Sequence, residues 1–242
     1  MENIKTVADL LKKARNGVVF TGAGVSVESG IPPFTGQGGL WNQYDPKFIE
    51  INFFYSDPAR SWKEMKEIFF SSMDEASPNK AHRVIAQLEE RGLVKGVITQ
   101  NIDGLHQRAG SKNVQEFHGT IHTLSCPSCS RRYKLEDVSL DEVPPVCFCG
   151  QVLKPDFVFY GEGIPPRAYR ESLDLAENAD VMLVVGTAGQ VMPACSLPLI
   201  AKQNGAKIIE VNTLPSAYTD TVSDYYFPVK ATEFFSALEK EL

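Results

Sequence analysis

The chain of 242 residues is long enough for one α/β domain with a modest insertion. Its 43% hydrophobic and 22% charged residues are typical of a soluble globular protein, and no apolar run reaches the ~18 residues that a membrane span needs. A net charge of -6 argues against a nucleic-acid-binding surface, because binding phosphates needs clustered Lys and Arg. The amphipathic start lacks the continuous apolar stretch of a signal peptide. We therefore expect a cytoplasmic protein with neither a membrane nor a nucleic-acid partner.

Short β-branched runs that end in polar or glycine-containing loops predict the strands of a parallel sheet. These runs occupy residues 17–21, 95–99, 181–187 and 207–212. Helical patterns occupy residues 81–91 and 194–204. Apolar strands that alternate with helices indicate a parallel sheet covered on both faces, in which ligands bind beyond the carboxyl ends of the strands. We expect the tails of the four runs, GAG, TQNID, GTA and VNT, to converge on one crevice.

Two segments interrupt this alternation. Residues 37–78 contain both tryptophans and several other aromatic residues, and predict a loop followed by helices. Residues 119–154 contain four cysteines and several prolines, and predict a compact ribbon. We expect these two inserts to form a small domain, and the remaining residues 1–36, 79–118 and 155–242 to form a nucleotide-binding domain.

The turn Gly22-Ala23-Gly24 follows the first predicted strand. Glycine lets backbone N–H groups approach a pyrophosphate closely, and a helix start, here predicted at Ser26–Ser29, favours negative charge. The third glycine is Gly30, which is farther along the chain than the usual dehydrogenase fingerprint requires. A plain tight turn remains the alternative interpretation.

Four cysteines form two close pairs, Cys126-x-x-Cys129 and Cys147-x-Cys149. Four thiolates suit tetrahedral zinc and leave no position for a catalytic water, so the predicted metal is one structural zinc ion. In an extended segment residues i and i+2 share a face, so both sulfurs of the second pair reach one metal, with Gly150 supplying the turn. A redox or unligated set is the alternative, and His122 is an alternative ligand. The fifth cysteine, Cys195, stands in an apolar stretch and is expected to be a small buried residue.

Polar side chains that follow the second predicted strand are candidates for chemistry. Asn101 and Asp103 place an amide and a carboxylate there, although Asp103 is equally suited to be a helix N-cap. His118 is followed by a glycine and leads into the cysteine segment, so it is able to project towards the crevice. A general base and an ordinary structural histidine are the two interpretations of His118.

Taken together, these residues closely resemble the sirtuin family from about Val18 to the C-terminal region. The matching motifs are TGAGVSVESGIPPF, TQNIDGLHQRAGS, EFHG, the paired cysteines, KPDFVFYGE, GTAGQVMPA and EVN. The resemblance implies a Rossmann-like parallel sheet with helices on both faces, plus a small zinc-ribbon and helical module. It also implies an NAD-dependent protein-lysine deacylase whose partners are acylated-lysine proteins or peptides.

The resemblance further implies a role for each matching residue. His118 is similar to the general base, while Asn101 and Asp103 orient the departing nicotinamide. The strand that pairs with a substrate peptide is lined by Phe157, Val158 and Tyr160. The implied contacts with NAD come from Gly22, Ala23, Gly24, Ser26, Phe34, Thr35, Gln100, Ile102, Asp103, Gly186, Thr187, Ala188, Asn212, Thr213, Lys230 and Ala231. The implied zinc ligands are Cys126, Cys129, Cys147 and Cys149.

Two positions depart from the family's common motifs. Thr35 stands where an arginine is usual, and the common GTS ends here in Ala188. Both changes remove hydrogen-bond donors, which predicts weaker use of NAD. They also keep a non-catalytic NAD or ADP-ribose sensor open as an alternative. A second alternative is NAD glycohydrolysis or ADP-ribosyl transfer in the same pocket, against which the KPDFVFYGE segment and His118 favour deacylation.

The helical insert bears on the choice of acyl group. Members of the family that prefer succinyl-lysine carry a Tyr and an Arg three residues apart in this insert. Alignment on Trp62 places Met65 and Ile68 at these positions. Neither side chain can hold a carboxylate, so the sequence predicts neutral acyl groups.

Overall fold

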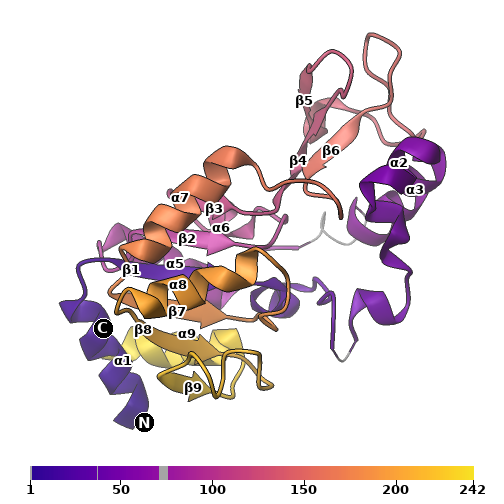
Figure 1. Ribbon diagram of the computed structural model, residues 1–242. Helices are drawn as coiled ribbons and strands as arrows, with labels where there is room; N and C mark the ends of the chain where they lie inside the picture. Colours follow the sequence, from indigo (N-terminus) through magenta and orange to yellow (C-terminus); the bar gives the residue numbers. More distant parts are fainter. Residues whose placement is uncertain (1, 37, 71–75) are drawn as a thin grey trace.

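The computed structural model describes residues 2–36, 38–70 and 76–242 (Figure 1). Within these residues the main element is a six-stranded parallel sheet in the order β3-β2-β1-β7-β8-β9. The strands are β1 (Gly17–Thr21), β2 (Gly96–Thr99), β3 (Val114–Glu116), β7 (Val181–Val185), β8 (Lys207–Val211) and β9 (Tyr225–Phe227). The four inner strands were predicted, and the two edge strands were not, because three residues are too few to show a period.

The register of the sheet brings the carboxyl ends of its central strands together. Thr21, the last residue of β1, lies opposite Thr99 on β2 and Val185 on β7. From β1 the chain builds outward through β2 and β3, and it later resumes on the other side of β1 at β7. The winding therefore reverses beside β1, and in open parallel sheets ligands bind in the crevice at such a point.

Helices cover both faces of the large sheet, as predicted. Alternate residues of β1 point to opposite faces, with Val19 packed among residues of α1, α5 and α9, and Val18 and Phe20 packed among residues of α7 and α8. These helices are α1 (Glu2–Lys13), α5 (Lys80–Glu90), α7 (Pro166–Glu177), α8 (Leu197–Gln203) and α9 (Ala231–Glu241). No helix in the described ranges is long and apolar enough to cross a membrane.

A smaller antiparallel sheet in the order β5-β4-β6 lies beside helices α2 and α3 (Figure 1). Its strands are β4 (Gly119–Ser125), β5 (Arg132–Lys134) and β6 (Lys154–Phe157), and the helices are α2 (Ile51–Ser56) and α3 (Pro58–Met65), with a π-helical turn at Lys66–Phe70. The helices and the sheet share one aromatic core. Trp62 on α3 is buried in this core, and its indole N–H donates to Leu153 O at 2.7 Å, so the two inserts are held together.

The division into a large and a small domain remains a proposal. Because β6 pairs with β4, a boundary between residues 154 and 155 would divide a strand of the small sheet. Residues 37 and 71–75 of the predicted helical insert lie outside the described residues.

The glycine turn after β1 leads into two 3₁₀ turns, Ala23–Val25 and Val27–Ser29. The helix predicted to open at Ser26–Ser29 is thus only a single 3₁₀ turn, with Ser26 as its N-cap. Gly30 ends the second turn in the left-handed conformation, with a φ of 93°. Pro32 and Pro33 follow and cannot donate backbone hydrogen bonds, so the turn cannot extend into an α-helix.

Candidate functional site

A cavity of about 970 Å³ opens beyond the carboxyl ends of the central strands. Its walls include the tails of β1, β2, β7 and β8, together with residues 33–36 and 157–162. The predicted convergence of the GAG, TQNID, GTA and VNT segments is confirmed. The volume lies at the upper end of the range for small-molecule sites, so it suits a ligand as large as a dinucleotide.

The predicted NAD and peptide residues line this cavity, except for two. Ser26 and Asp103 line a small adjoining pocket, of which Ala23, Phe34, Asn101 and Ile102 are also part. The cavity also contains residues that the sequence analysis missed. They include the apolar side chains of Trp41, Ile49, Phe69 and Phe159, the segment Gly189–Pro193 after β7, and the two acids Glu28 and Glu162. The aromatic richness of residues 37–78 was the available signal for the apolar part.

The glycines of the first turn are required by the packing of two turns on each other. Gly24 N donates to Gly186 O at 2.8 Å, and a Cβ at Gly24 would lie 2.6 Å from the Gly186 Cα atom. A Cβ at Gly22 would lie 2.8 Å from Gly186 O. The glycines therefore form a tight turn, as one interpretation of the motif predicted. This packing also places the turn on the cavity wall, as the pyrophosphate-binding interpretation requires.

Thr187 joins three strand tails. Its hydroxyl accepts a hydrogen bond from Gln100 Nε2 at 3.0 Å, and its main-chain oxygen accepts one from Asn212 Nδ2 at 3.0 Å. The tails of β2, β7 and β8 are thus bonded to one another before any ligand binds. Such preorganisation lowers the entropy that ligand binding must overcome.

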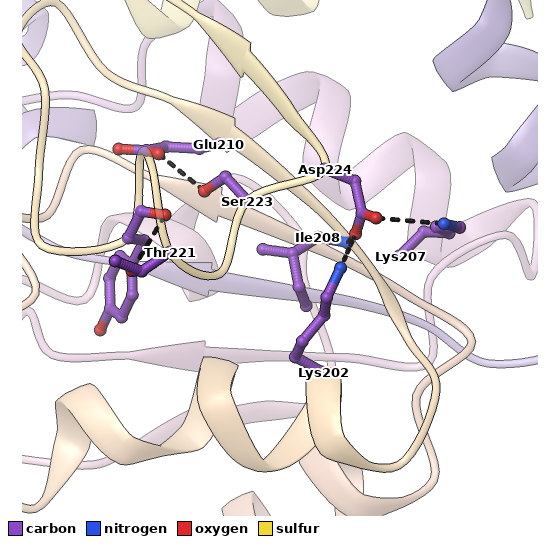
Figure 2. Close-up of polar contacts among 8 residues, drawn as sticks. Lys202, Lys207, Ile208, Glu210, Thr221, Ser223 and Asp224 are labelled. Carbon is purple, nitrogen blue, oxygen red and sulfur yellow. Dashed lines mark hydrogen bonds and ion pairs between the residues drawn. The ribbon is translucent and has the colours of Figure 1, made fainter.

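A buried carboxylate anchors the loop that follows β8. Glu210 on β8 is 1% exposed, and its oxygens accept hydrogen bonds from the hydroxyl groups of Ser216, Thr219 and Ser223. Figure 2 shows the Glu210–Ser223 bond and, at the end of the loop, Asp224 with its partners Lys202, Lys207 and Ile208. This loop begins with Asn212 and Thr213, two of the predicted NAD residues, and the anchor holds its later part from Ser216 to Ser223.

The Asp103 carboxylate is held on both oxygens. Its Oδ2 accepts a hydrogen bond from Ser26 Oγ at 2.6 Å, and its Oδ1 accepts one from Leu105 N at 2.9 Å. Asn101 Nδ2 donates to the same Ser26 Oγ at 3.1 Å. Gly104, not Asp103, is the N-cap of the short helix α6 (Leu105–Arg108). The carboxylate is therefore fixed in position at the small pocket.

Two buried histidines lie behind this carboxylate. The rings of His82 and His106 are 4.8 Å apart, and His106 Nε2 lies 3.0 Å from Thr21 Oγ1. Burial lowers the pKa of His82 to about 4, against the opposing effect of the Asp103 charge, and burial also lowers the pKa of His106. Both rings are therefore neutral at pH 7, and neither neutralises Asp103.

His118 follows β3 and lines the cavity. Its Nδ1 lies 3.1 Å from Gln100 O, and because a carbonyl only accepts, Nδ1 carries the proton. In the neutral ring Nε2 is then the unprotonated nitrogen. Burial lowers the pKa of His118, although the bond to Gln100 opposes the shift, so the ring is neutral at physiological pH. A neutral imidazole on the wall of a cavity fits a proton acceptor better than a structural histidine.

The segment after β6 forms another wall, and its main-chain donors are already in use. Val158 N donates to His118 O at 2.8 Å, and Tyr160 N donates to Ile49 O at 2.9 Å. Phe157, Val158 and Tyr160, the residues predicted to pair with a substrate peptide, line the cavity, and the N–H groups of Val158 and Tyr160 are taken by this chain. Addition of a substrate strand needs main-chain groups beyond these.

The four paired cysteines meet at one point of the ribbon. Their Sγ atoms lie within 4.8 Å of one another, which suits one tetrahedral zinc ion. The second pair was predicted to lie in an extended segment, and this prediction is wrong. Gly150 N donates to Cys147 O at 2.8 Å and closes a tight turn, in which Gly150 has a φ of 87°. His122 is outside this cluster. Cys195 is only partly buried, and its Sγ contacts the exposed Met192 Sδ at 3.2 Å, so the expected burial is wrong.

A profile of the Sir2 family matches residues 22–193. This chain belongs to the Sir2 family. The NAD-dependent protein deacylase 2 of Pyrobaculum aerophilum is 47% identical over 98% of this chain and 94% of its own length. The NAD-dependent protein deacetylase of Thermotoga maritima is 41% identical over 92% of each chain.

Solved structures of the family share the whole fold. A Sir2 structure with a p53 peptide and NAD+ superimposes with a TM-score of 0.91 at 40% identity, covering 98% of both chains. A Sir2 bound to an acetylated peptide gives a TM-score of 0.90 at 39% identity, again over 98% of both chains. The predicted family and fold class are confirmed.

Proposed function

We propose that this chain is an NAD-dependent protein-lysine deacylase, which transfers the acyl group from a lysine side chain to ADP-ribose and releases nicotinamide. The observation that carries the proposal is the large cavity together with its small adjoining pocket. The two bring together the neutral His118, the aromatic wall from the helical insert and the Asp103 carboxylate at the ends of the central strands. A base, an apolar channel and an amide-binding carboxylate are the groups that this reaction needs.

The residues present fit NAD. The small pocket offers the Asp103 carboxylate to the nicotinamide amide, while Gln100, Asn212 and Thr213 offer polar groups along the large cavity. Of the described residues that line the cavity, Lys230 is the one lysine or arginine, which makes it our candidate partner for the negatively charged part of the dinucleotide. When bound, NAD supplies an activated ribose carbon and nicotinamide as the leaving group.

His118 and the ribbon have separate tasks in this proposal. His118 Nε2 accepts the proton of a ribose hydroxyl, because Nδ1 is already occupied as a donor to Gln100 O. The aromatic wall excludes water from the reacting groups. The zinc ion is saturated by four sulfurs and holds only the small sheet in shape. We propose a cytoplasmic location, which a cysteine cluster suited to zinc rather than to disulfides supports.

One assay tests the function and separates its alternatives. Purified protein is mixed with NAD, with and without an acetyl-lysine peptide, and nicotinamide release is measured. We expect release only with the peptide, accompanied by the deacetylated product. Release that does not need the peptide would identify a glycohydrolase, and binding without release would identify a sensor.

For the acyl group, we expect a kcat/KM on an acetyl-lysine peptide at least tenfold higher than on a succinyl-lysine peptide. Met65 and Ile68 are both buried in the aromatic core and provide no cation. Leaving a carboxylate unpaired against the apolar wall costs more than the ~1.4 kcal/mol that corresponds to tenfold. Steady-state kinetics on the two matched peptides measures the ratio, and a preference for the succinyl peptide would reject this account.

Thr35→Arg is expected to raise kcat/KM for NAD by about ten- to a hundredfold. Thr35 is exposed and lies on the cavity wall, so a longer side chain has room to reach a phosphate or ribose. A charge-assisted hydrogen bond contributes about 1.5–3 kcal/mol. The competing view is that the loop around Pro33 is already rebuilt to bind NAD by other contacts.

Thr35→Gln serves as the matched control, because it adds length and hydrogen-bonding capacity without charge. Rate measurements at low NAD concentration compare the three proteins. If the wild type is already efficient and arginine harms it, the loop has been rebuilt and arginine is not missing.

A further inference from the structure

The segment that follows β3 runs along the loop that carries Asp103. Among the described residues, four main-chain carbonyl groups of residues 99–103 accept hydrogen bonds from residues 117–122. In chain order the bonds are Phe117 N to Thr99 O at 2.9 Å, His118 Nδ1 to Gln100 O at 3.1 Å, Ile121 N to Ile102 O at 3.2 Å and His122 Nε2 to Asp103 O at 3.1 Å. This row of bonds, called the zipper below, joins the candidate base and the candidate carboxylate into one unit.

His122 closes the zipper at its Asp103 end. Because Asp103 O only accepts, His122 Nε2 carries the proton of this bond. The ring also lies against Gly104, where an added Cβ would be 2.5 Å from His122 Nε2. Gly104 has a φ of 67°, so the chain at this point is held in a conformation that few other residues adopt. The imidazole therefore fixes the peptide group between Asp103 and Gly104.

The orientation of that peptide group determines the position of the Asp103 carboxylate. Leu105 N, which donates to Asp103 Oδ1, is only two residues along the chain from Asp103. A rotation of the Asp103–Gly104 peptide moves this donor, and it moves the Cα atom from which the carboxylate projects. The bond from His122 to the main chain and the bonds at the carboxylate are thus coupled.

We propose that His122 is a positioning residue for the Asp103 end of the cavity. By holding Asp103 O, it keeps the carboxylate where a nicotinamide amide binds. His122 lines neither the cavity nor the small pocket, so it acts through Asp103. This role rests on the proposed function, in which Asp103 binds nicotinamide. Since His122 lies on β4, it also links the order of the zinc-bearing sheet to the pocket.

Two substitutions of His122 test the proposal. His122→Ala removes the donor, and His122→Gln keeps an N–H group at a similar reach. We expect His122→Ala to raise, by about three- to tenfold, both KM for NAD and the nicotinamide concentration that halves the rate, as for the loss of one hydrogen bond. KM for the acetyl-lysine peptide should stay unchanged, and glutamine should restore most of the loss.

Hydrogen exchange gives a readout that does not depend on turnover. In the protein without NAD or peptide, the Leu105 amide should exchange faster in His122→Ala than in the wild type. The matched control is Thr123→Val, which removes the 2.6 Å bond from Thr123 to Asp156 on the same strand and should leave exchange and kinetics as in the wild type.

Unchanged exchange at Leu105 and unchanged nicotinamide sensitivity in His122→Ala would overturn the proposal. An equal effect of Thr123→Val on exchange and kinetics would also overturn it, because the effect would then not be specific to the bond between His122 and Asp103. If the wild type releases no nicotinamide with the peptide, the proposed function fails. Exchange at Leu105 then still decides whether His122 fixes the loop.

Discussion

His118→Ala is expected to lower the rate of deacylation by about 10²-fold or more, the scale for removing a positioned general base. Nε2 of the neutral ring is the group that accepts the proton, and alanine leaves nothing in its place. NAD binding, measured by calorimetric titration, should remain within about threefold of the wild type, because the small pocket is unaltered and the strand tails lose only the one bond from His118 to Gln100 O. A variant that turns over normally would show that His118 is not the base.

The pH profile of the wild type provides an independent check on this role. Protonated His118 cannot accept a proton, so activity is present above its pKa and is lost as the pH falls through it. Because burial lowers the pKa of His118 below the ordinary value of 6.5, the acid limb of the profile should lie below pH 6.5. An acid limb well above this value would assign the limiting proton to another group.

Replacing Cys147 by serine is expected to abolish stoichiometric zinc binding and to lower the midpoint of thermal unfolding by about 10 °C. Zinc-finger peptides bind the metal with about 10–16 kcal/mol, and this free energy stabilises the fold. A loss of only ~4 kcal/mol corresponds to about 8–16 °C in a chain of this size. Elemental analysis of freshly purified protein should find one zinc ion per chain.

Cys195→Ser is the matched control for the zinc prediction. Cys195 is outside the four-cysteine cluster, so its substitution should leave the zinc content unchanged and the unfolding midpoint close to that of the wild type. A freshly purified wild type without stoichiometric zinc would contradict the assignment. An equal loss of stability in the two variants would show that the four-cysteine cluster does not stabilise the fold more than a cysteine outside it.

The sequence alone was sufficient for the features that rest on local patterns. Strands such as Val181–Val185 are apolar at every position, because a parallel strand buried on both faces needs no polar side. The spacing of the paired cysteines predicted a common site, since few other residue sets suit tetrahedral zinc. The long motifs around Gly22, Asn101 and His118 carried the family resemblance, and with it the expected function.

Local patterns gave wrong predictions of the backbone conformation in two short turns. The segment Val27–Ser29 forms a 3₁₀ turn because Gly30 stops it, and the turn at Cys147 closes on the left-handed Gly150. In both cases a single glycine permits a positive φ. The surrounding structure decides whether the glycine adopts it, and the sequence alone does not show this.

Only the tertiary structure decided the contacts between residues far apart in the chain. Ser26 and Asp103 bond across a separation of 77 residues, and His122 reaches Asp103 across 19. No period or spacing in the sequence encodes such a pair, because each partner is placed by a different strand or loop and they meet only when the sheet has assembled. The sequence therefore determined which chemical groups this protein carries, whereas the packing of the strand ends against one another and against β4 determined which of them lie together.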